Sequence, residues 1–187
     1  MKKRTLYAVA TILAIIMIAG CGGTAKTANL FANPLPAHLP QDAPQWLKNP
    51  RAGLLKTDIV FIGKSEALKD EDEARSSAQL DAGKRYNTFI QNTALHYIFY
   101  AAKQMNTVKP YVPSKRMSVL GGEVRDIYTM HQADGRYTVY AWYIIPGTDV
   151  RDSIDLTLRS LREDEYVPDY RVIIDRALRL FRGYNNF

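Results

Sequence analysis

Gly63-Lys64-Ser65 is the segment whose residue types lie closest to a known chemistry, the binding of phosphate. A complete phosphate-binding loop also needs a glycine five positions before the one that precedes the lysine, so that backbone amides can surround the phosphate. In this chain that position is Asp58, whose carboxylate would repel the ligand. We therefore interpret the segment as a turn that ends a strand.

The titratable residues indicate neither a metal site nor a catalytic group. His38, His96 and His131 are far apart in the sequence, whereas zinc sites gather histidine and cysteine ligands. Ser65 lacks the sequence context of a nucleophile elbow, and Asp126 is expected to pair with an arginine or to face solvent. Because catalytic triads are defined by geometry and not by sequence order, an envelope enzyme stays open as a third class of function. We predict no catalytic residue, no metal and no cofactor.

The first 20 residues are typical of an export signal. Positively charged residues 2–4 precede an apolar stretch at 6–18, which is shorter than the roughly 20 residues of a membrane span. The stretch ends in Ile18-Ala19-Gly20-Cys21, which resembles the lipobox of bacterial lipoproteins. There the cysteine thiol accepts a diacylglyceryl group, and cleavage then makes the cysteine the new N-terminus. The alternative is an uncleaved anchor helix with an incidental cysteine.

Cys21 is the only cysteine, so the chain cannot form an internal disulfide. Lipid on its sulfur would explain a lone thiol in an oxidising compartment. We therefore predict that residues 1–20 are removed and that Cys21 carries the lipid that anchors the protein to a membrane. Gly22 stands where an aspartate favours retention in the inner membrane of many Gram-negative bacteria, and this pattern favours the outer membrane.

The net charge of +6 overstates the charge of the mature chain. Lys2, Lys3 and Arg4 lie in the segment that export would remove, which contains no acid, so +3 is left on the chain from Cys21. A basic charge indicates nucleic-acid binding only where it belongs to the folded domain. We therefore predict no nucleic-acid partner.

Residues 21–45 are expected to be the lipidated N-terminus and a tether. Prolines at positions 34, 36, 40 and 44 favour an extended backbone over the second half of this segment. Trp46 ends the tether and is expected to insert into the domain, so that residues 46–187 form a single globular domain. No internal repeat is visible in this domain.

The hydrophobic pattern of the domain predicts an α+β fold. A buried strand at 59–62 precedes a helix that begins near Asp70, whose stripe of alanines and aromatics runs to Met105. A strand at 116–131 is expected to have a bulge or kink at Gly121-Gly122, and Asp134-Gly135 predicts a two-residue hairpin loop. The return strand at 136–145 is apolar on both faces and is therefore expected to be central.

Two C-terminal helices complete the prediction of a compact β-α-β-β domain with helical additions. Thr148 is expected to cap a helix that runs to about residue 162, and a second helix is predicted at 169–182. The second helix has an apolar face and a basic face, the latter formed by Arg171, Arg176, Arg179 and Arg182. The basic face could contact anionic lipid headgroups, an acidic partner or peptidoglycan carboxylates. The alternative is a solvated helix surface.

Several short segments in a fixed order resemble the Lpp-twenty lipoprotein family, whose domain also occurs in flagellar outer-membrane lipoproteins and flagellar assembly proteins. The resemblance covers residues 44–162 and rests on Pro44-Gln45-Trp46-Leu47, Ile62-Gly63-Lys64-Ser65, the alanine-spaced helix, the strand segment 122–128, Asp134-Gly135 and the strand at 137–145. It implies a compact β-α-β-β domain, outer-membrane attachment and no catalytic activity. The longer helix and the added basic helix at 169–182 depart from the family pattern.

These observations favour a non-enzymatic lipoprotein of the outer membrane that faces the periplasm. It would act as a structural or interaction component of the cell envelope, with a homo-oligomer, another envelope protein or the flagellar motor as candidate assemblies. The alternative is a binding module for peptidoglycan or a regulator of an envelope enzyme.

Overall fold

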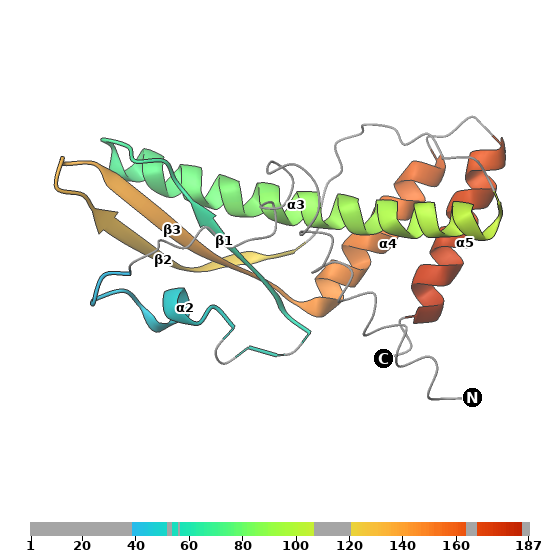
Figure 1. Cartoon of the computed structure of the whole chain (residues 1–187), viewed down its shortest axis with the longest axis horizontal. Coiled ribbons are helices and arrows are strands. Elements are labelled where there is room, and N and C mark those ends of the chain that lie inside the picture. Colours follow the sequence, from blue (N-terminus) through green and yellow to red (C-terminus); the bar gives the residue numbers. More distant parts are fainter. Residues whose placement is uncertain (1–38, 52–53, 56, 107–120, 164–167, 185–187) are drawn as a thin grey trace. The chain divides into compact units, whose positions relative to one another are not determined.

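The computed structural model describes residues 39–51, 54–55, 57–106, 121–163 and 168–184 (Figure 1). They belong to one compact unit, Asn33–Phe187. The expected signal segment, Cys21, His38 and most of the expected tether lie outside the described residues, as do positions 116–120 of the expected second strand. Among the helices that are described, none has the length and apolar composition of a membrane span.

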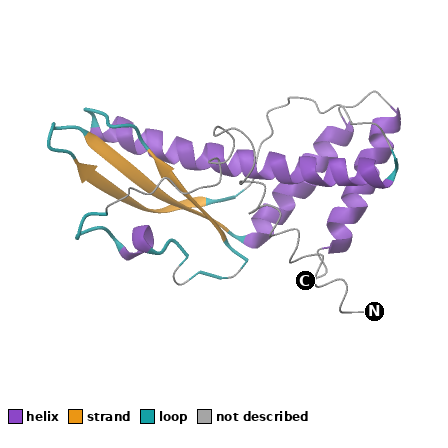
Figure 2. Ribbon diagram, viewed as in Figure 1, coloured by secondary structure: helices purple, strands orange, loops and turns teal. Residues whose placement is uncertain are grey.

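The fold is α+β, as predicted, and contains a three-stranded antiparallel sheet (Figure 2). Strands β1 (Ile59–Lys64), β2 (Glu123–His131) and β3 (Tyr137–Ile145) follow the order β1-β3-β2. The central place of β3, predicted from its two apolar faces, is confirmed. Ile59 pairs with Ile145 at one end of β1, and His131 pairs with Tyr137 beside the hairpin.

The bulge of β2 does not lie at the glycine pair, so of the bulge or kink predicted there the bulge was wrong. The register shifts between Val124 and Asp126, whereas Gly121 and Gly122 precede the strand with φ of 72° and 87°. A side chain at Gly121 would also collide with the carboxylate of Asp149, because its Cβ would lie 2.1 Å from Oδ2. Left-handed backbone and close contact therefore account for this glycine.

The β2–β3 hairpin is confirmed, but its loop has three residues instead of two. The backbone amide of Gln132 donates to the carbonyl of Arg136 at 2.8 Å, and the amide of Gly135 donates to the carbonyl of Gln132 at 3.0 Å. Gly135 adopts φ of 80°, the left-handed conformation that closes a three-residue loop after a tight turn. Asp134 accepts a hydrogen bond from the amide of Arg136 at 3.1 Å and so stabilises the turn.

The long helix α3 (Glu71–Gln104) connects the two halves of the domain (Figure 1). Asp70 caps it by accepting a hydrogen bond from the amide of Glu73 at 2.8 Å, and acidic residues in its first turn suit the positive end of the helix dipole. The first part of the helix packs its fully buried alanines on the sheet. The later part packs on the two C-terminal helices through larger apolar residues, including Ile90 and Ile98.

Gly63 sets how closely β1 approaches α3. A Cβ at this position would lie 1.9 Å from the carbonyl oxygen of Ala78 and 2.8 Å from the Cβ of Ala82. Glycine on the strand and alanine on the helix are therefore both needed for this contact. The segment Gly63-Lys64-Ser65 ends a strand, as interpreted from the sequence, and its glycine serves packing.

The other face of the sheet is covered by the short helix α2 (Gln45–Lys48). Trp46 is buried, as expected, and stacks on Trp142 with ring centroids 5.6 Å apart and an interplanar angle of 2°. The indole Nε1 of Trp46 donates to Asp126 Oδ2 at 2.7 Å. Asp126 is exposed on the edge strand β2, which agrees with the expected contact with solvent, and its side-chain partner is an indole and not an arginine. Leu39 and Ala43 belong to the same cluster, which shows that the packed part of the chain begins before residue 46.

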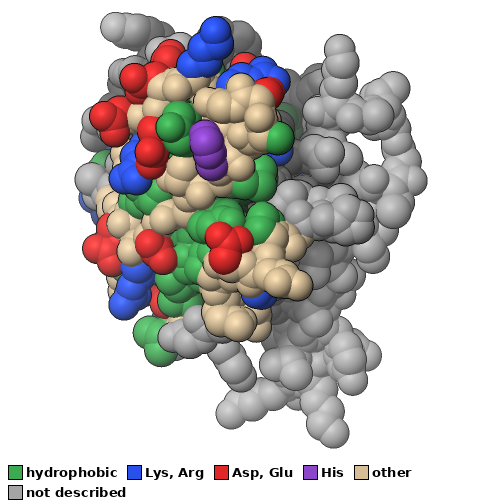
Figure 3. Space-filling view, turned by 90° about the vertical axis from the view of Figure 1, so that its left-hand side faces the viewer, with side chains coloured by type: hydrophobic (Ala, Val, Ile, Leu, Met, Phe, Trp, Pro, Cys, Tyr) green, Lys and Arg blue, Asp and Glu red, His purple; other side chains and the backbone are tan. Residues whose placement is uncertain are grey.

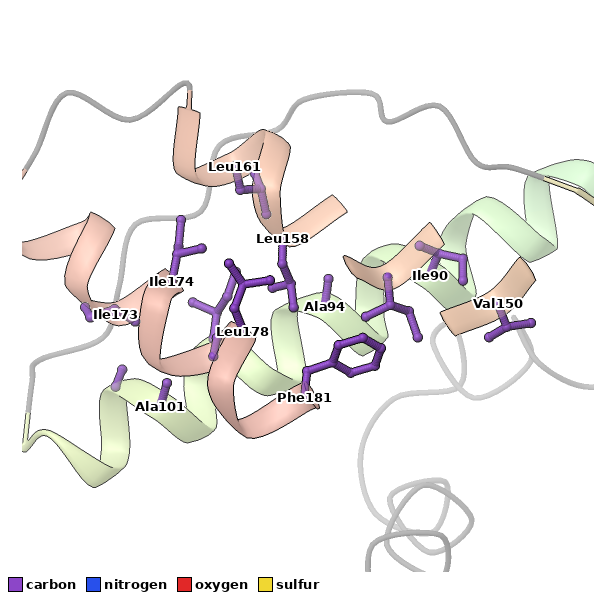
Figure 4. Packing of buried hydrophobic residues seen from close by; sticks show 14 of the residues in the cluster. Ile90, Ala94, Ala101, Val150, Leu158, Leu161, Ile173, Ile174, Leu178 and Phe181 are labelled. Carbon is purple, nitrogen blue, oxygen red and sulfur yellow. The ribbon is translucent and has the colours of Figure 1, made fainter. Parts of the chain in front are cut away.

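Helices α4 (Gly147–Glu163) and α5 (Pro168–Tyr184) pack against the far part of α3 (Figure 4). All six residues predicted as the apolar face of α5 are buried: Tyr170, Ile173, Ile174, Ala177, Leu178 and Phe181. Thr148 is not the cap of α4, which corrects the sequence prediction. The amides of Asp149 and Val150 both donate to the carbonyl of Pro146, so the helical turn starts two residues before Thr148.

Substitution of Gly63 tests the contact between strand and helix. We expect Gly63→Ala to lower the free energy of unfolding by about 3 kcal/mol, because the added methyl group meets the α3 backbone. The matched control is Gly83→Ala in the middle of α3, where a Cβ would meet nothing within 4 Å. That change should stabilise the helix by about 0.5–1 kcal/mol. Urea unfolding measures both, and a neutral Gly63→Ala would contradict the assigned contact.

Candidate functional site

Helices α4 and α5 carry the same sequence pattern, 20 residues apart. Positions 149–162 and 169–182 are identical at seven of 14 places: Asp149 and Asp169, Arg151 and Arg171, Ile154 and Ile174, Asp155 and Asp175, Leu158 and Leu178, Arg159 and Arg179, and Arg162 and Arg182. The sequence analysis found no repeat, which was wrong. The repeat is one helix long, and its identical positions are interspersed with positions that differ. It therefore resembles the ordinary pattern of an amphipathic helix.

The repeated helices run antiparallel, and their charged residues pair reciprocally. Arg182 of α5 lies 2.8 Å from Asp155 of α4, and Arg162 of α4 lies 2.6 Å from Asp175 of α5. The repeat matches Asp155 to Asp175 and Arg162 to Arg182, so exchanging the two helices converts one ion pair into the other. The helix pair therefore has an approximate internal two-fold relation.

Asp155 is the centre of the more buried of these pairs. Its side chain is 19% exposed and lies 2.6 Å from Arg159 as well as 2.8 Å from Arg182. Burial alone would raise the pKa of the Asp155 carboxyl, but the hydrogen bond from Arg182 and the charges of Arg182 and Arg159 lower it overall. The same contact raises the pKa of Arg182. Asp155 is therefore ionised at neutral pH.

The exposed side of the helix pair is rich in arginine. Helical spacing of three, four and seven residues places six exposed arginines beside the ion pairs, and we call them the arginine face: Arg151, Arg159, Arg162, Arg171, Arg179 and Arg182. Asp152, Asp155 and Asp175 lie among them, so six positive and three negative charges leave +3. Arg179 makes no hydrogen bond or ion pair with the described part of the chain.

Arginine is used on these helices to the exclusion of lysine. Residues 147–184 contain seven of the 14 arginines of the chain and none of its 11 lysines. The guanidinium group is planar, permanently charged and able to hold a carboxylate or phosphate with two hydrogen bonds. The composition therefore favours recognition of oxyanions over general solubility.

The four arginines predicted from the sequence to form a basic face fall into two groups in the structure. Arg171, Arg179 and Arg182 belong to the arginine face, whereas Arg176 donates to Gln104 Oε1 at the end of α3, at 3.1 and 3.3 Å. The contribution of α4, from Arg151, Arg159 and Arg162, was not predicted from the sequence. The repeat would have revealed these three, because they match Arg171, Arg179 and Arg182.

A hollow of about 400 Å³ opens on this face. Arg151, Arg159 and Arg182 line it together with Asp152 and Asp155, and Phe181 and Thr148 complete its wall. Cationic groups thus surround an open depression in which Asp155 is already neutralised by two arginines. The depression can accept an anionic group, for which Arg151 supplies a cation that makes no ion pair with the described residues.

A second polar hollow, of about 450 Å³, lies where β1, α3 and the hairpin meet, and its residues serve the fold. Ser65 is 2% exposed and accepts a hydrogen bond from the amide of Val139 at 2.9 Å. Asp81 binds Arg85 at 2.8 Å and the amide of Lys64 at 3.0 Å. These contacts hold the strand end against the helix and the hairpin.

The two described histidines have separate surroundings. His131 stacks on Tyr137 with ring centroids 5.0 Å apart, and His96 contacts Tyr97. Within the described residues, no group of three His, Cys, Asp or Glu side chains is placed to hold a metal ion. The arginine face is therefore the feature of this part of the chain that is best suited to binding.

No family model, curated protein or solved structure matches this chain. The resemblance to the Lpp-twenty family stays a prediction from the sequence segments quoted above.

Double-mutant cycles test the two reciprocal ion pairs. We expect the Asp155–Arg182 pair to couple by about 0.5–1 kcal/mol and the Asp175–Arg162 pair by less, since exposed pairs contribute about 0.2–1 kcal/mol and Asp155 is the less exposed acid. Urea unfolding of the single and double alanine variants at neutral pH measures both couplings. Equal couplings of zero would mean that the pairs do not hold the helices together.

Acid should remove the contribution of Asp155. The folded-state pKa of Asp155 is lowered, so its stabilisation is present above the unfolded value of about 3.9 and is lost as pH falls through the folded pKa. The destabilisation caused by Asp155→Asn at neutral pH should therefore shrink progressively below about pH 4. A cost that stays constant down to strongly acidic pH would contradict the ion-pair assignment.

Proposed function

We propose that this chain is a non-enzymatic lipoprotein of the bacterial cell envelope, anchored to the outer membrane through lipid on Cys21 and facing the periplasm. The folded unit would work by binding a partner and not by chemistry. The N-terminal pattern of positive residues, apolar stretch and Ile18-Ala19-Gly20-Cys21 supports the anchor. The order of strand, helix and hairpin at 59–145 also agrees with what the Lpp-twenty resemblance implies.

The arginine face is the observation that carries the binding role. Its charges are fixed on two helices whose mutual position is held by Asp155–Arg182 and Asp175–Arg162. Arg159, Arg162 and Arg182 are already ordered by ion pairs, so these three lose less side-chain entropy when the face binds. If charge were needed only for solubility, lysine would serve as well as arginine. The two repeated segments would also not need to form reciprocal ion pairs.

Ser65 and Asp126, the side chains considered as catalytic candidates, support a role without catalysis. Ser65 accepts a backbone hydrogen bond in the core, and Asp126 accepts the indole N–H of Trp46. Both side chains therefore contribute to the packing of the sheet. A catalytic nucleophile or general acid would instead contact a second catalytic side chain, whereas these two contacts go to a backbone amide and to an indole.

The second candidate is a binding module for peptidoglycan, or a regulator of an envelope enzyme. The specific observation in its favour is the oxyanion chemistry of the arginine face, because peptidoglycan stems carry carboxylates. A lipid anchor and a tether of about 25 residues would let the domain reach the wall, since a flexible chain of that length averages about 27 Å from end to end.

Substitution of Cys21 tests the proposed anchor. In a Gram-negative host the full chain should incorporate labelled palmitate and fractionate with the outer membrane, whereas Cys21→Ser should abolish labelling, because no other cysteine exists. Gly22→Asp is the matched control, since it keeps the lipid but should move the protein toward the inner membrane. Palmitate labelling that persists in Cys21→Ser would overturn the proposal.

A further inference from the structure

We infer that the arginine face binds the phosphodiester headgroups of an anionic phospholipid bilayer, so that α4 and α5 lie along a membrane surface. This inference rests on the proposed function, because it names the partner of the same face. It does not depend on the lipid at Cys21, because the face belongs to the folded unit. Three features of the helix pair and one of α3 support it.

The first feature is the choice of cation. Each guanidinium group offers five N–H donors in a fixed fork, and a phosphodiester presents two unesterified oxygens that match this fork. Arg159 and Arg182 share the single carboxylate of Asp155. Their remaining donors can therefore bind phosphate while the ion pair stays intact.

The second feature is the presence of exposed aliphatic side chains among the arginines. Leu156 of α4 is 45% exposed and lies three residues before Arg159, and Val172 of α5 is 49% exposed and lies seven residues before Arg179. These spacings place each aliphatic residue on the same side of its helix as an arginine. Aliphatic side chains beside cations suit the boundary between headgroups and acyl chains, whereas a polar wall polymer would leave them in water.

The third feature is the area over which the charge is spread. Each helix has 17 residues and is therefore about 25 Å long. The antiparallel repeat places an Arg-x-x-Arg pair on each helix, Arg159 with Arg162 and Arg179 with Arg182. Charge distributed in this way suits an extended sheet of headgroups better than one compact anion.

The fourth feature concerns the other candidate for a charged contact, a second copy of this chain. Acidic residues gather where α3 begins, at the end of the molecule seen in Figure 3. Two of them serve the fold there: Glu71 binds Arg75 at 2.6 Å and accepts from Thr129 at 3.2 Å, and Asp70 caps the helix. The hydrogen bond from Arg75 lowers the pKa of Glu71, which agrees with an acid that serves its own fold. In this cluster Asp72 and Glu73 are left to meet a second copy, and two carboxylates are too few to match the six arginines of the face, so a bilayer is the better match.

Vesicle co-sedimentation of the compact unit, residues 33–187 without signal or lipid, tests the inference. The probes are vesicles of phosphatidylcholine alone and of phosphatidylcholine with one third phosphatidylglycerol. We expect binding to the anionic vesicles only. The double variant Arg159→Gln with Arg179→Gln should weaken binding to the anionic vesicles about 25-fold, because each arginine near an anionic surface contributes about fivefold to the affinity.

Two controls distinguish an effect of the arginine face from an effect of net charge or of unfolding. Lys69→Gln with Lys84→Gln removes the same charge from exposed positions of the α3 region and should leave binding within about twofold, because distant charges are screened. Leu156→Asn with Val172→Asn should weaken binding at unchanged charge, whereas Leu80→Asn, at a leucine 59% exposed on α3, should not. Circular dichroism melting confirms that each variant is folded.

The outcomes distinguish this inference from the proposed function. Equal loss in the lysine and arginine variants, or no loss in either, would overturn the inference. Binding to purified peptidoglycan sacculi that needs Arg159 and Arg179, without vesicle binding, would overturn it and keep a binding role for the face. Self-association that needs the same arginines, without vesicle binding, would assign the face to a second copy and also overturn it. Failure of the anchor would show only in the Cys21 experiment.

Discussion

The contact between β1 and α3 at Gly63 is the constraint on which the domain depends. With the Ala78 carbonyl 1.9 Å from where a Cβ would lie, the strand and the helix approach backbone to backbone. This contact places the first half of α3 on the sheet and leaves its second half to extend past the strands. The extension supplies Ile90, Ala94 and Ile98 as the surface on which α4 and α5 pack. The position of the arginine face therefore depends on a glycine in the sheet.

The repeated sequence pattern of α4 and α5 determines how these helices pack on the extension of α3. Its identical positions fall into two groups: Ile154, Ile174, Leu158 and Leu178 are buried against α3, whereas Asp155, Asp175 and the repeated arginines are partly or fully exposed. The buried set fixes how each helix sits on α3, and the pairs Asp155–Arg182 and Asp175–Arg162 add polar contacts between the two helices. One repeated pattern thus determines both the packing and the charge of the surface.

The sequence predicted what depends on periodicity and missed what depends on tertiary contact. The apolar face of α5, the long stripe of α3 and the central place of β3 follow from burial patterns that a linear sequence displays. The position of the β2 bulge does not, because a glycine pair suggests a bulge whether or not it serves another contact, as Gly121 does with Asp149. The same holds for Asp126, whose partner Trp46 lies 80 residues away.

The candidate site shows why such contacts matter for function. On a helical wheel, one side of α5 carries Arg171, Arg176, Arg179 and Arg182. In the structure Arg176 instead binds Gln104 at the end of α3, and α4 adds three arginines to the remaining three of α5. The face is thus a property of two helices that only packing brings together. Asp155 and Asp175 form the ion pairs between the helices, and the six arginines of the face outnumber the three aspartates among them. Positive charge is therefore in excess on the exposed side of the helices and separate from their apolar buried side. That separation lets the core stay apolar while the surface selects an oxyanion-bearing partner.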